Sequence, residues 1–326
     1  MTQRSYTKNY TIDTPHLKSS ENKRPKYNPR LGDFTYQYSR RALEAFGFHA
    51  VSFCFFILWN KNKTDGDFNR TIWIKREITI HDNGVVNLAD PFFDGTFFAN
   101  ENEEQLYRDL DFFRGHYMQC RYMVVKNLQE NFRLSGQTQV AVEVAVGEGK
   151  CLRKRPVSLA DMESMLIENS NGKFKMKKPL IFYETDLERY LSLHSAETGA
   201  VFPGDCDMLL YDADGRCRYI LEFKKCTPNG PIPVEKQSFL NYIAADRSKY
   251  VRLNLLRKYM EETEGRKIPL VNVFYPIATE QVIKLEEISR DMNSGVVRIL
   301  QMKNDPEENQ YRLFQTIHET DFLERD

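Results

Sequence analysis

The sequence has no excess charge of either sign, no long hydrophobic run and no paired cysteine motif. Its 46 Lys and Arg residues balance 46 Asp and Glu residues, so a nucleic acid would have to bind a local basic patch. The longest apolar run, residues 50–59, is too short to cross a bilayer, and no signal-peptide pattern is present. These absences predict a protein with no membrane partner, in the cytoplasm or, in a eukaryote, the nucleus.

The six cysteines form no C-x-x-C pair and the six histidines are scattered, which argues against a zinc site and favours reduced thiols. The chain has no G-x-S-x-G motif and no cysteine that can be tied to a histidine, so a serine or cysteine hydrolase finds little support. A P-loop is also absent, so ATP-driven action would need a partner protein.

At 326 residues the chain is long enough for two domains. We expect a disordered basic arm over residues 1–33, a strand-rich domain for recognition or dimerisation over 34–149, and a second domain over 150–326. The patterns predict helices at 38–46, 103–126, 159–167, 234–264 and 279–292, and strands at 50–59, 71–80, 137–146, 270–277 and 295–302.

The most informative stretch is residues 203–226, where two strand-like runs flank the dipeptide Asp214-Gly215. This dipeptide is a strong signal for a two-residue hairpin loop. Pairing outward from the loop places Asp207 opposite Glu222, and strand alternation adds Lys224 to the same face. The opposite face takes Met208, Leu210, Leu221 and Phe223.

Two carboxylates opposed across a strand pair repel one another, so we expect a cation between them. Mg²⁺, for which Mn²⁺ would substitute, prefers hard carboxylate oxygens, and the neighbouring ammonium of Lys224 can orient an attacking water. Asp205 is the rival of Asp207 because it shares the strand parity; the apolar strand that follows Asp207 favours the latter. A surface hairpin in which Lys224 only neutralises Glu222 is the structural alternative.

Gly204-x-x-Asp207, the hairpin and then Glu222-Phe223-Lys224 resemble the signature of the PD-(D/E)xK nuclease superfamily. The resemblance implies an α+β fold with a restriction-endonuclease-like mixed central sheet flanked by helices. It also implies that Asp207, Glu222 and the carbonyl of Phe223 bind Mg²⁺ and that Lys224 positions the nucleophilic water. The order of hairpin, helix and buried strand agrees with the family core.

Two further residues match the family more weakly. Glu188, in a capping box at the start of a predicted helix, is the best match to an additional family glutamate, although capping alone explains it. Gln237 and Tyr242 resemble a glutamine and tyrosine on the helix after the signature, at a spacing one residue longer than usual. Gln237 is therefore expected to contact the site or the substrate.

Two basic runs lie before the hairpin. Such runs usually face water, but beside a phosphodiesterase site they are also what a polyanion channel requires. The candidate phosphate contacts are Arg153, Lys154, Arg155, Lys175, Lys177 and Lys178.

Together these features predict a Mg²⁺-dependent endonuclease acting on DNA, of a restriction or phage-defence type. Cleavage of both strands of a duplex at one place calls for two active sites, so a homodimer is expected. The alternative is a non-catalytic module for nucleic-acid binding or assembly that keeps the nuclease-like core.

Overall fold

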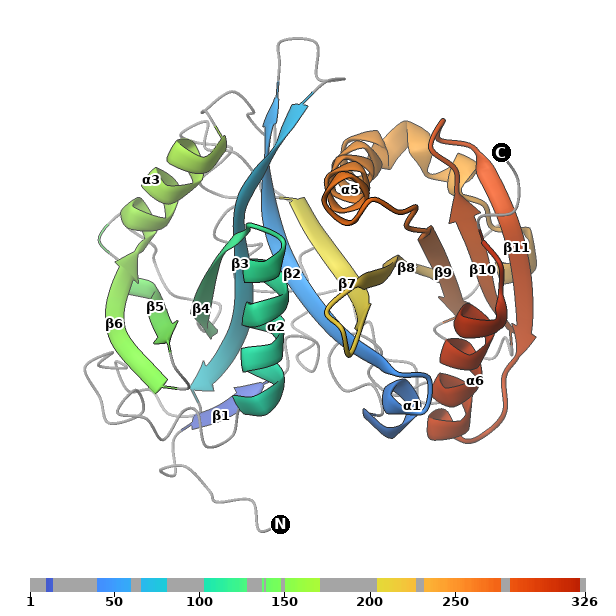
Figure 1. Ribbon diagram of the computed structural model, residues 1–326, viewed down its shortest axis with the longest axis horizontal. Helices are drawn as coiled ribbons and strands as arrows, with labels where there is room; N and C mark the ends of the chain where they lie inside the picture. Colours follow the sequence, from blue (N-terminus) through green and yellow to red (C-terminus); the bar gives the residue numbers. More distant parts are fainter. Residues whose placement is uncertain are drawn as a thin grey trace. The chain divides into compact units, whose positions relative to one another are not determined.

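The structure is a computed structural model that describes residues 10–13, 40–59, 66–80, 103–127, 137, 139–147, 150–170, 204–226, 232–276 and 282–322. Residue contacts divide the chain into unit 1, residues 1–25 and 54–203, and unit 2, residues 26–53 and 204–326. Each unit combines a mixed sheet with helices, so the fold is α+β (Figure 1). Residues 150–170, which the sequence grouped with the second domain, belong to unit 1 in this division.

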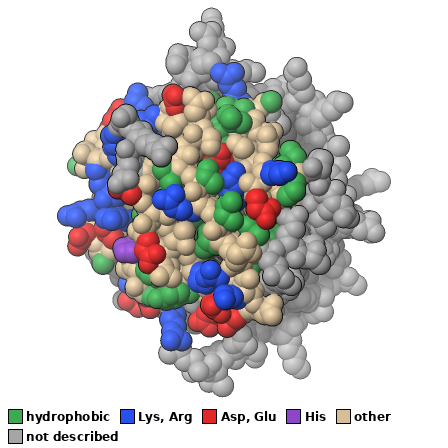
Figure 2. Space-filling model, turned by 90° about the vertical axis from the view of Figure 1, so that its right-hand side faces the viewer, with side chains coloured by type: hydrophobic (Ala, Val, Ile, Leu, Met, Phe, Trp, Pro, Cys, Tyr) green, Lys and Arg blue, Asp and Glu red, His purple; other side chains and the backbone are tan. Residues whose placement is uncertain are grey.

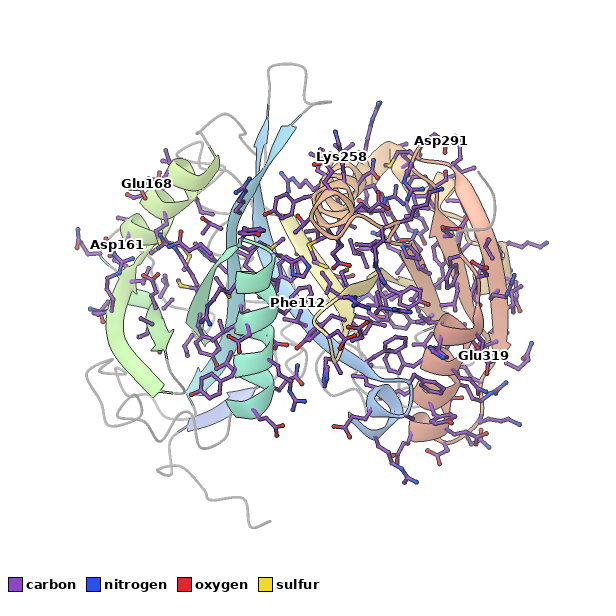
Figure 3. All side chains as sticks on the ribbon, in the orientation of Figure 1. Phe112, Asp161, Glu168, Lys258, Asp291 and Glu319 are labelled. Atoms are coloured by element: carbon purple, nitrogen blue, oxygen red, sulfur yellow. The ribbon has the colours of Figure 1, made fainter. Side chains whose placement is uncertain are left out.

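The sheet of unit 1 contains the second part of β2 (Phe48–Trp59), then β3 (Gly66–Ile80), β4 (Gln119–Asn127), β5 (Gln139–Gly147) and β6 (Lys150–Ser158). β3 and β4 are parallel and the other neighbours antiparallel. Trp73, Met123 and Leu166 are among the buried side chains that pack α3 (Leu159–Ser170) on this sheet. Asp161 and Glu168 lie on the exposed side of α3 (Figure 3).

Three expectations for unit 1 need correction. The helix predicted over 103–126 ends as α2 (Glu103–Gly115), because the chain turns at Tyr117 with a φ of 56° and continues as β4, in which residues 122–124 are all buried. Residues 150–156, for which no helix or strand was predicted, belong to strand β6, which pairs with β5. Residues 10–13, within the expected disordered arm, form strand β1 (Tyr10–Asp13), which is paired with β3.

The sheet of unit 2 has the order β11, β10, β9, β8, β7 and the first part of β2. Its strands are β7 (Gly204–Asp212), β8 (Cys217–Cys226), β9 (Leu270–Pro276), β10 (Val282–Ile288) and β11 (Ser294–Gln301). β8 and β9 are parallel, and the crossover between them contains two 3₁₀ turns, Val234–Lys236 and Phe239–Asn241, and the helix α5 (Ile243–Glu264). No helix in the described ranges is long and apolar enough to span a membrane.

The two faces of this sheet differ in chemistry. One face is apolar and packs against α1 (Arg40–Glu44) and α6 (Pro306–Glu319), with Met208, Leu210, Leu221 and Phe223 in that core. These are the four residues predicted to point away from the acids, so the predicted strand parity is confirmed. The opposite face carries buried polar groups, Asn272 among them, under α5. A core on one side therefore leaves the other side of the hairpin for polar chemistry.

Some expectations for unit 2 hold and others are wrong. The strands at 270–277 and 295–302 are confirmed as β9 and β11. The helix predicted over 279–292 is wrong, because residues 282–288 form strand β10, buried along its whole length. The helix predicted from residue 234 begins only at Ile243, after the two 3₁₀ turns. No element was predicted near the C-terminus, yet α6 begins there with an Asp305 cap and a proline in its first turn.

The hairpin loop is one residue longer than predicted. The N–H of Asp212 donates to the carbonyl of Arg216 at 3.0 Å, so Ala213, Asp214 and Gly215 form the loop, with Gly215 at a φ of 74°. A bulge between Leu210 and Tyr211 absorbs the extra residue. The register that places Asp207 opposite Glu222 is therefore kept as far as Leu210, which pairs with Tyr219, and shifts by one residue at Tyr211, which pairs with Cys217.

Replacing Gly215 with alanine tests the backbone of this loop. A Cβ at Gly215 would meet nothing within 4 Å, so the cost comes from the left-handed φ alone, about 1–2 kcal/mol. Gly115→Ala is the matched control, since its site is equally open and it lies at the end of a helix with no positive φ. Urea unfolding should show a loss for Gly215→Ala and none for Gly115→Ala. Equal effects would contradict this account of the loop.

Candidate active site

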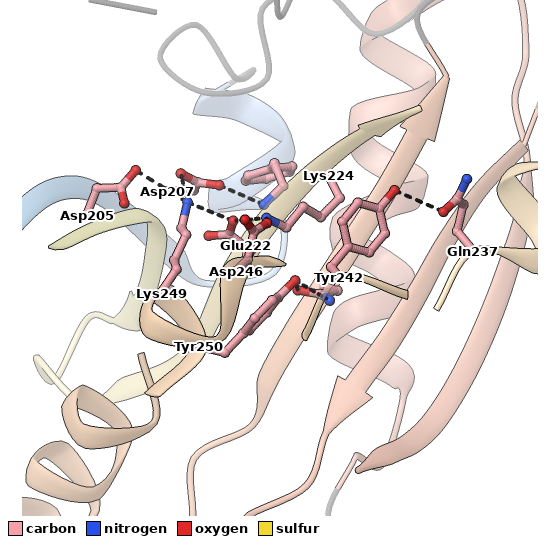
Figure 4. Close-up of polar contacts among 11 residues, drawn as sticks. Asp205, Asp207, Glu222, Lys224, Gln237, Tyr242, Asp246, Lys249 and Tyr250 are labelled. Carbon is pink, nitrogen blue, oxygen red and sulfur yellow. Dashed lines mark hydrogen bonds and ion pairs between the residues drawn. The ribbon is translucent and has the colours of Figure 1, made fainter. Parts of the chain in front are cut away.

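Asp207 on β7 and Glu222 and Lys224 on β8 lie on the polar face of the unit 2 sheet, beneath α5 (Figure 4). The register of the hairpin, Met208 with Leu221 and Leu209 with Ile220, places Asp207 opposite Glu222 when carried one residue further. Both carboxyl groups are buried, with 6% of Asp207 and 1% of Glu222 exposed. The hairpin thus brings two acids and a lysine together inside the protein.

The side chain of Asp207 accepts a hydrogen bond from a main-chain N–H of the neighbouring strand. Its Oδ2 accepts a hydrogen bond from the N–H of Phe223 at 2.8 Å, and its main-chain carbonyl accepts one from the hydroxyl of Ser52. The N–H and C=O of one strand residue point to the same side, so the Phe223 carbonyl is directed toward Asp207 as well. Asp207, Glu222 and this carbonyl therefore present oxygen atoms to one region.

Glu222 is the most buried acid of the group. Its Oε1 lies 2.7 Å from Nζ of Lys249 and 3.1 Å from Nζ of Lys224, as ion pairs without directed hydrogen-bond geometry. Its Oε2 has no hydrogen-bond donor among the residues described. Burial and the neighbouring charge of Asp207 raise the pKa of Glu222 to about 7, although the two lysines oppose this. A carboxylate oxygen without a partner inside a protein calls for a cation or a proton.

Lys224 is fixed from several sides. Its Nζ lies 2.8 Å from Oδ2 of Asp246 and stands above the rings of Tyr242 and Tyr250, 5.5 and 5.3 Å from their centroids. Burial alone would lower the pKa of Lys224, but the carboxylates, Glu222 first, hold the pKa above its ordinary value. Lys224 is therefore a charged group in a defined position.

Gln237 reaches the site only through Tyr242. Its amide nitrogen donates to the carbonyl of Ile232 at 2.7 Å, and its amide oxygen accepts from the hydroxyl of Tyr242 at 2.9 Å. The ring of Tyr242 then contacts Lys224. The pair suggested by the sequence is in contact despite its unusual spacing, because a single 3₁₀ turn, Phe239–Asn241, rather than an α-helix separates the two residues.

The sequence missed Asp246 and Lys249, which α5 directs onto the hairpin. The side chain of Lys249 is only 25% exposed and contacts three carboxylates. Arg252 and Arg257 of the same helix are also buried. Asp246, Lys249 and Arg252 are three residues apart, so they lie on one face of the helix. This spacing was visible in the sequence, but it did not show that the face is buried.

The donor chemistry of the cluster fits a hard divalent cation, since it offers carboxylate oxygens and one of them is buried without a donor. In the described ranges, however, no group of three or more His, Cys, Asp or Glu side chains is arranged as a metal site. The ammonium of Lys249 lies among the oxygens instead, 3.3 Å from Asp205, 3.4 Å from Asp207 and 2.7 Å from Glu222. Asp205 and Asp207, the two alternative metal ligands predicted from the sequence, thus both contact the ammonium of Lys249.

The structure gives less support to the other predicted site residues, Glu188 and the six candidate phosphate contacts. Arg155, in unit 1, pairs with Glu143 at 2.7 Å, a carboxylate that it shares with Arg121. Figure 2 shows Lys and Arg side chains mixed with Asp and Glu side chains on the face it displays, so the residues described there form no single-signed patch. Glu188 and the side chains of five expected phosphate contacts lie outside the described residues: Arg153, Lys154, Lys175, Lys177 and Lys178.

Comparison with known proteins assigns no family. No family model matches the chain, and no curated protein matches it. A solved structure described as the sex pheromone staph-cAM373 precursor aligns over 82% of this chain and 83% of its own, at 9% identity and a TM-score of 0.19. That score is too low to carry any argument about fold or function.

Glu222→Gln tests the burial of this charge through the pH dependence of stability. The folded protein keeps the proton of Glu222 to about pH 7, whereas the unfolded chain loses it near the ordinary value of 4.5. Between these values the unfolded state binds fewer protons, so the contribution of Glu222 to stability falls as pH rises, by up to about 3 kcal/mol.

The measurement is the free energy of unfolding of the parent minus that of the variant, at pH 5 and pH 8. The parent should be relatively more stable at pH 5. Glu262→Gln, which removes an exposed carboxylate of α5, is the control. A parent-minus-variant difference that is the same at both pH values would contradict a raised pKa for Glu222.

Proposed function

We propose that this protein is a divalent-metal-dependent nuclease that hydrolyses phosphodiester bonds of DNA. The supporting observation is the position of Asp207, Glu222 and Lys224 on one buried face of the β7–β8 hairpin. The resemblance of these residues to the PD-(D/E)xK signature supports the same reading, as does the order of hairpin, α5 and the buried parallel strand β9.

In this proposal Asp207, Glu222 and the carbonyl of Phe223 hold Mg²⁺ or Mn²⁺. The bound ion would supply Lewis-acid stabilisation of the charge that develops on the phosphate oxygens. Lys224 donates one of its three N–H groups to Asp246 and pairs electrostatically with Glu222, and in this proposal a further N–H orients the attacking water. Tyr242, itself fixed by Gln237, limits the movement of Lys224 and so positions it.

The substrate and assembly belong to the same proposal. DNA would contact the basic runs before the hairpin, and a homodimer would bring two sites to one duplex. By the resemblance, the products would carry a 5′-phosphate. A restriction or phage-defence nuclease is the type of protein that these features fit best. Its proposed location is the cytoplasm, or the nucleus if the protein is eukaryotic.

A second candidate function is a non-catalytic module for nucleic-acid binding or assembly. The observation that favours it is the ammonium of Lys249, which already lies among the three carboxylates as a counter-ion. A site permanently filled by a lysine would not take up a metal. Titration with Mn²⁺ separates the two candidates, because only the nuclease requires a bound ion.

Lys224→Ala tests the proposed mechanism. Loss of the group that orients the water should lower Mg²⁺-dependent cleavage of DNA by about 10²–10⁴-fold while the protein stays folded. Lys258→Ala is the control, since Lys258 is an exposed lysine of the same unit, on α5, paired with Glu262 (Figure 3). Cleavage by Lys224→Ala at the parental rate would remove Lys224 from the mechanism.

A substrate panel tests the activity itself. Supercoiled plasmid, linear duplex, single-stranded DNA and RNA are incubated with the protein, with and without Mg²⁺. We expect cleavage of DNA only when Mg²⁺ is present, and its loss on addition of EDTA. Binding of DNA without cleavage under every metal condition would favour the non-catalytic module.

A further inference from the structure

Lys249 is the cation at the centre of the acidic cluster. It lies one turn after Asp246 on α5 and extends between β7 and β8 (Figure 4). Its Nζ is within 3.4 Å of one oxygen from each of Asp205, Asp207 and Glu222. Burial alone would lower the pKa of Lys249, but the three carboxylates hold it well above its ordinary value. The lysine is therefore charged and places a positive charge among the three carboxylates, beside that of Lys224.

A divalent ion would need the same oxygens. Mg²⁺ binds carboxylates at about 2.0–2.1 Å, closer than the ammonium, and an ion bound to both Asp207 and Glu222 would lie in the space that Nζ occupies. Two cations that close repel strongly in a buried site. Lysine and metal therefore exclude one another at these two acids.

Of the two lysines in the cluster, Lys249 is the one able to leave. Lys224 has Asp246 as a second carboxylate and two aromatic rings around it, and its side chain is only 13% exposed. Lys249 is 25% exposed and ends a flexible four-carbon stem. Asp205, the outermost of its three acids at 37% exposure, can keep the ammonium when it moves outward.

We propose that Lys249 is a resident counter-ion of Asp207 and Glu222 that a divalent metal must displace, so that lysine and metal compete for the site. This inference rests on the proposed function, because it assigns the regulation of the same metal site. Without metal, Lys249 holds the two acids together and keeps the hairpin under α5. With metal, it is released toward Asp205 and the surface.

The test removes the charge of Lys249 and measures metal binding and stability, not cleavage. Lys249→Met keeps the length of the side chain, and Lys258→Met is the control on the exposed face of α5. Calorimetric titration of the full chain with Mn²⁺ should show at least about tenfold tighter binding to Lys249→Met than to the parent. Without metal, Lys249→Met should unfold at lower urea than the parent, and Mn²⁺ should raise its stability more than that of the parent.

If Lys249→Met does not fold, Lys249→Gln and Lys249→Arg provide the same comparison between a neutral and a charged side chain. The neutral glutamine should also tighten Mn²⁺ binding, whereas the arginine, still charged, should not. Unchanged or weaker binding in the neutral variants would overturn the competition while leaving a metal site in place. A parent and neutral variants that are folded but bind no Mn²⁺ would overturn both the competition and the proposed metal-dependent nuclease.

Discussion

Two carboxyl groups buried side by side, Asp207 and Glu222, are the constraint to which unit 2 is adapted. Like charges in a poorly polarisable interior repel strongly, and removing one partner of such a cluster leaves an uncompensated buried charge. The ammonium groups of Lys224 and Lys249 offset this repulsion, and the raised pKa of Glu222 reduces it further. Such an arrangement is costly for stability alone, which is why we read it as a site prepared for a cation.

The rest of unit 2 places these groups. The apolar face of the sheet packs on α1 and α6, so the polar face is left to α5, which the parallel crossover from β8 to β9 brings above it. A second polar cluster anchors the segment before α5: Glu286 of β10 accepts from the hydroxyl of Ser238 and from the N–H of Phe239, each at 2.7 Å. Lys284 donates to the carbonyl of Gln237. These contacts fix where α5 begins and thereby where Asp246 and Lys249 point.

Local sequence rules were enough to predict the hairpin. The features that they missed, strand β10 and the burial of Lys249, depend on tertiary contacts. Alternation along two short strands was enough to put Asp207, Glu222 and Lys224 on one face, although the loop was one residue longer, because a bulge restored the register. Strand β10 was read as a helix because its buried Lys284 and Glu286 find partners that no sequence window contains. Lys249 was missed for the same reason: a lysine on a long helix normally faces water, and only the carboxylates of a distant hairpin explain its burial.

The central claim is that the acids of the β7–β8 hairpin form a cation site, and anomalous diffraction from crystals grown with Mn²⁺ tests it most directly. The account predicts a Mn²⁺ ion bonded to carboxylate oxygens of Asp207 and Glu222, with the ammonium of Lys249 moved away from both. A crystal with Mn²⁺ elsewhere or absent, and with Lys249 still between the two acids, would contradict it.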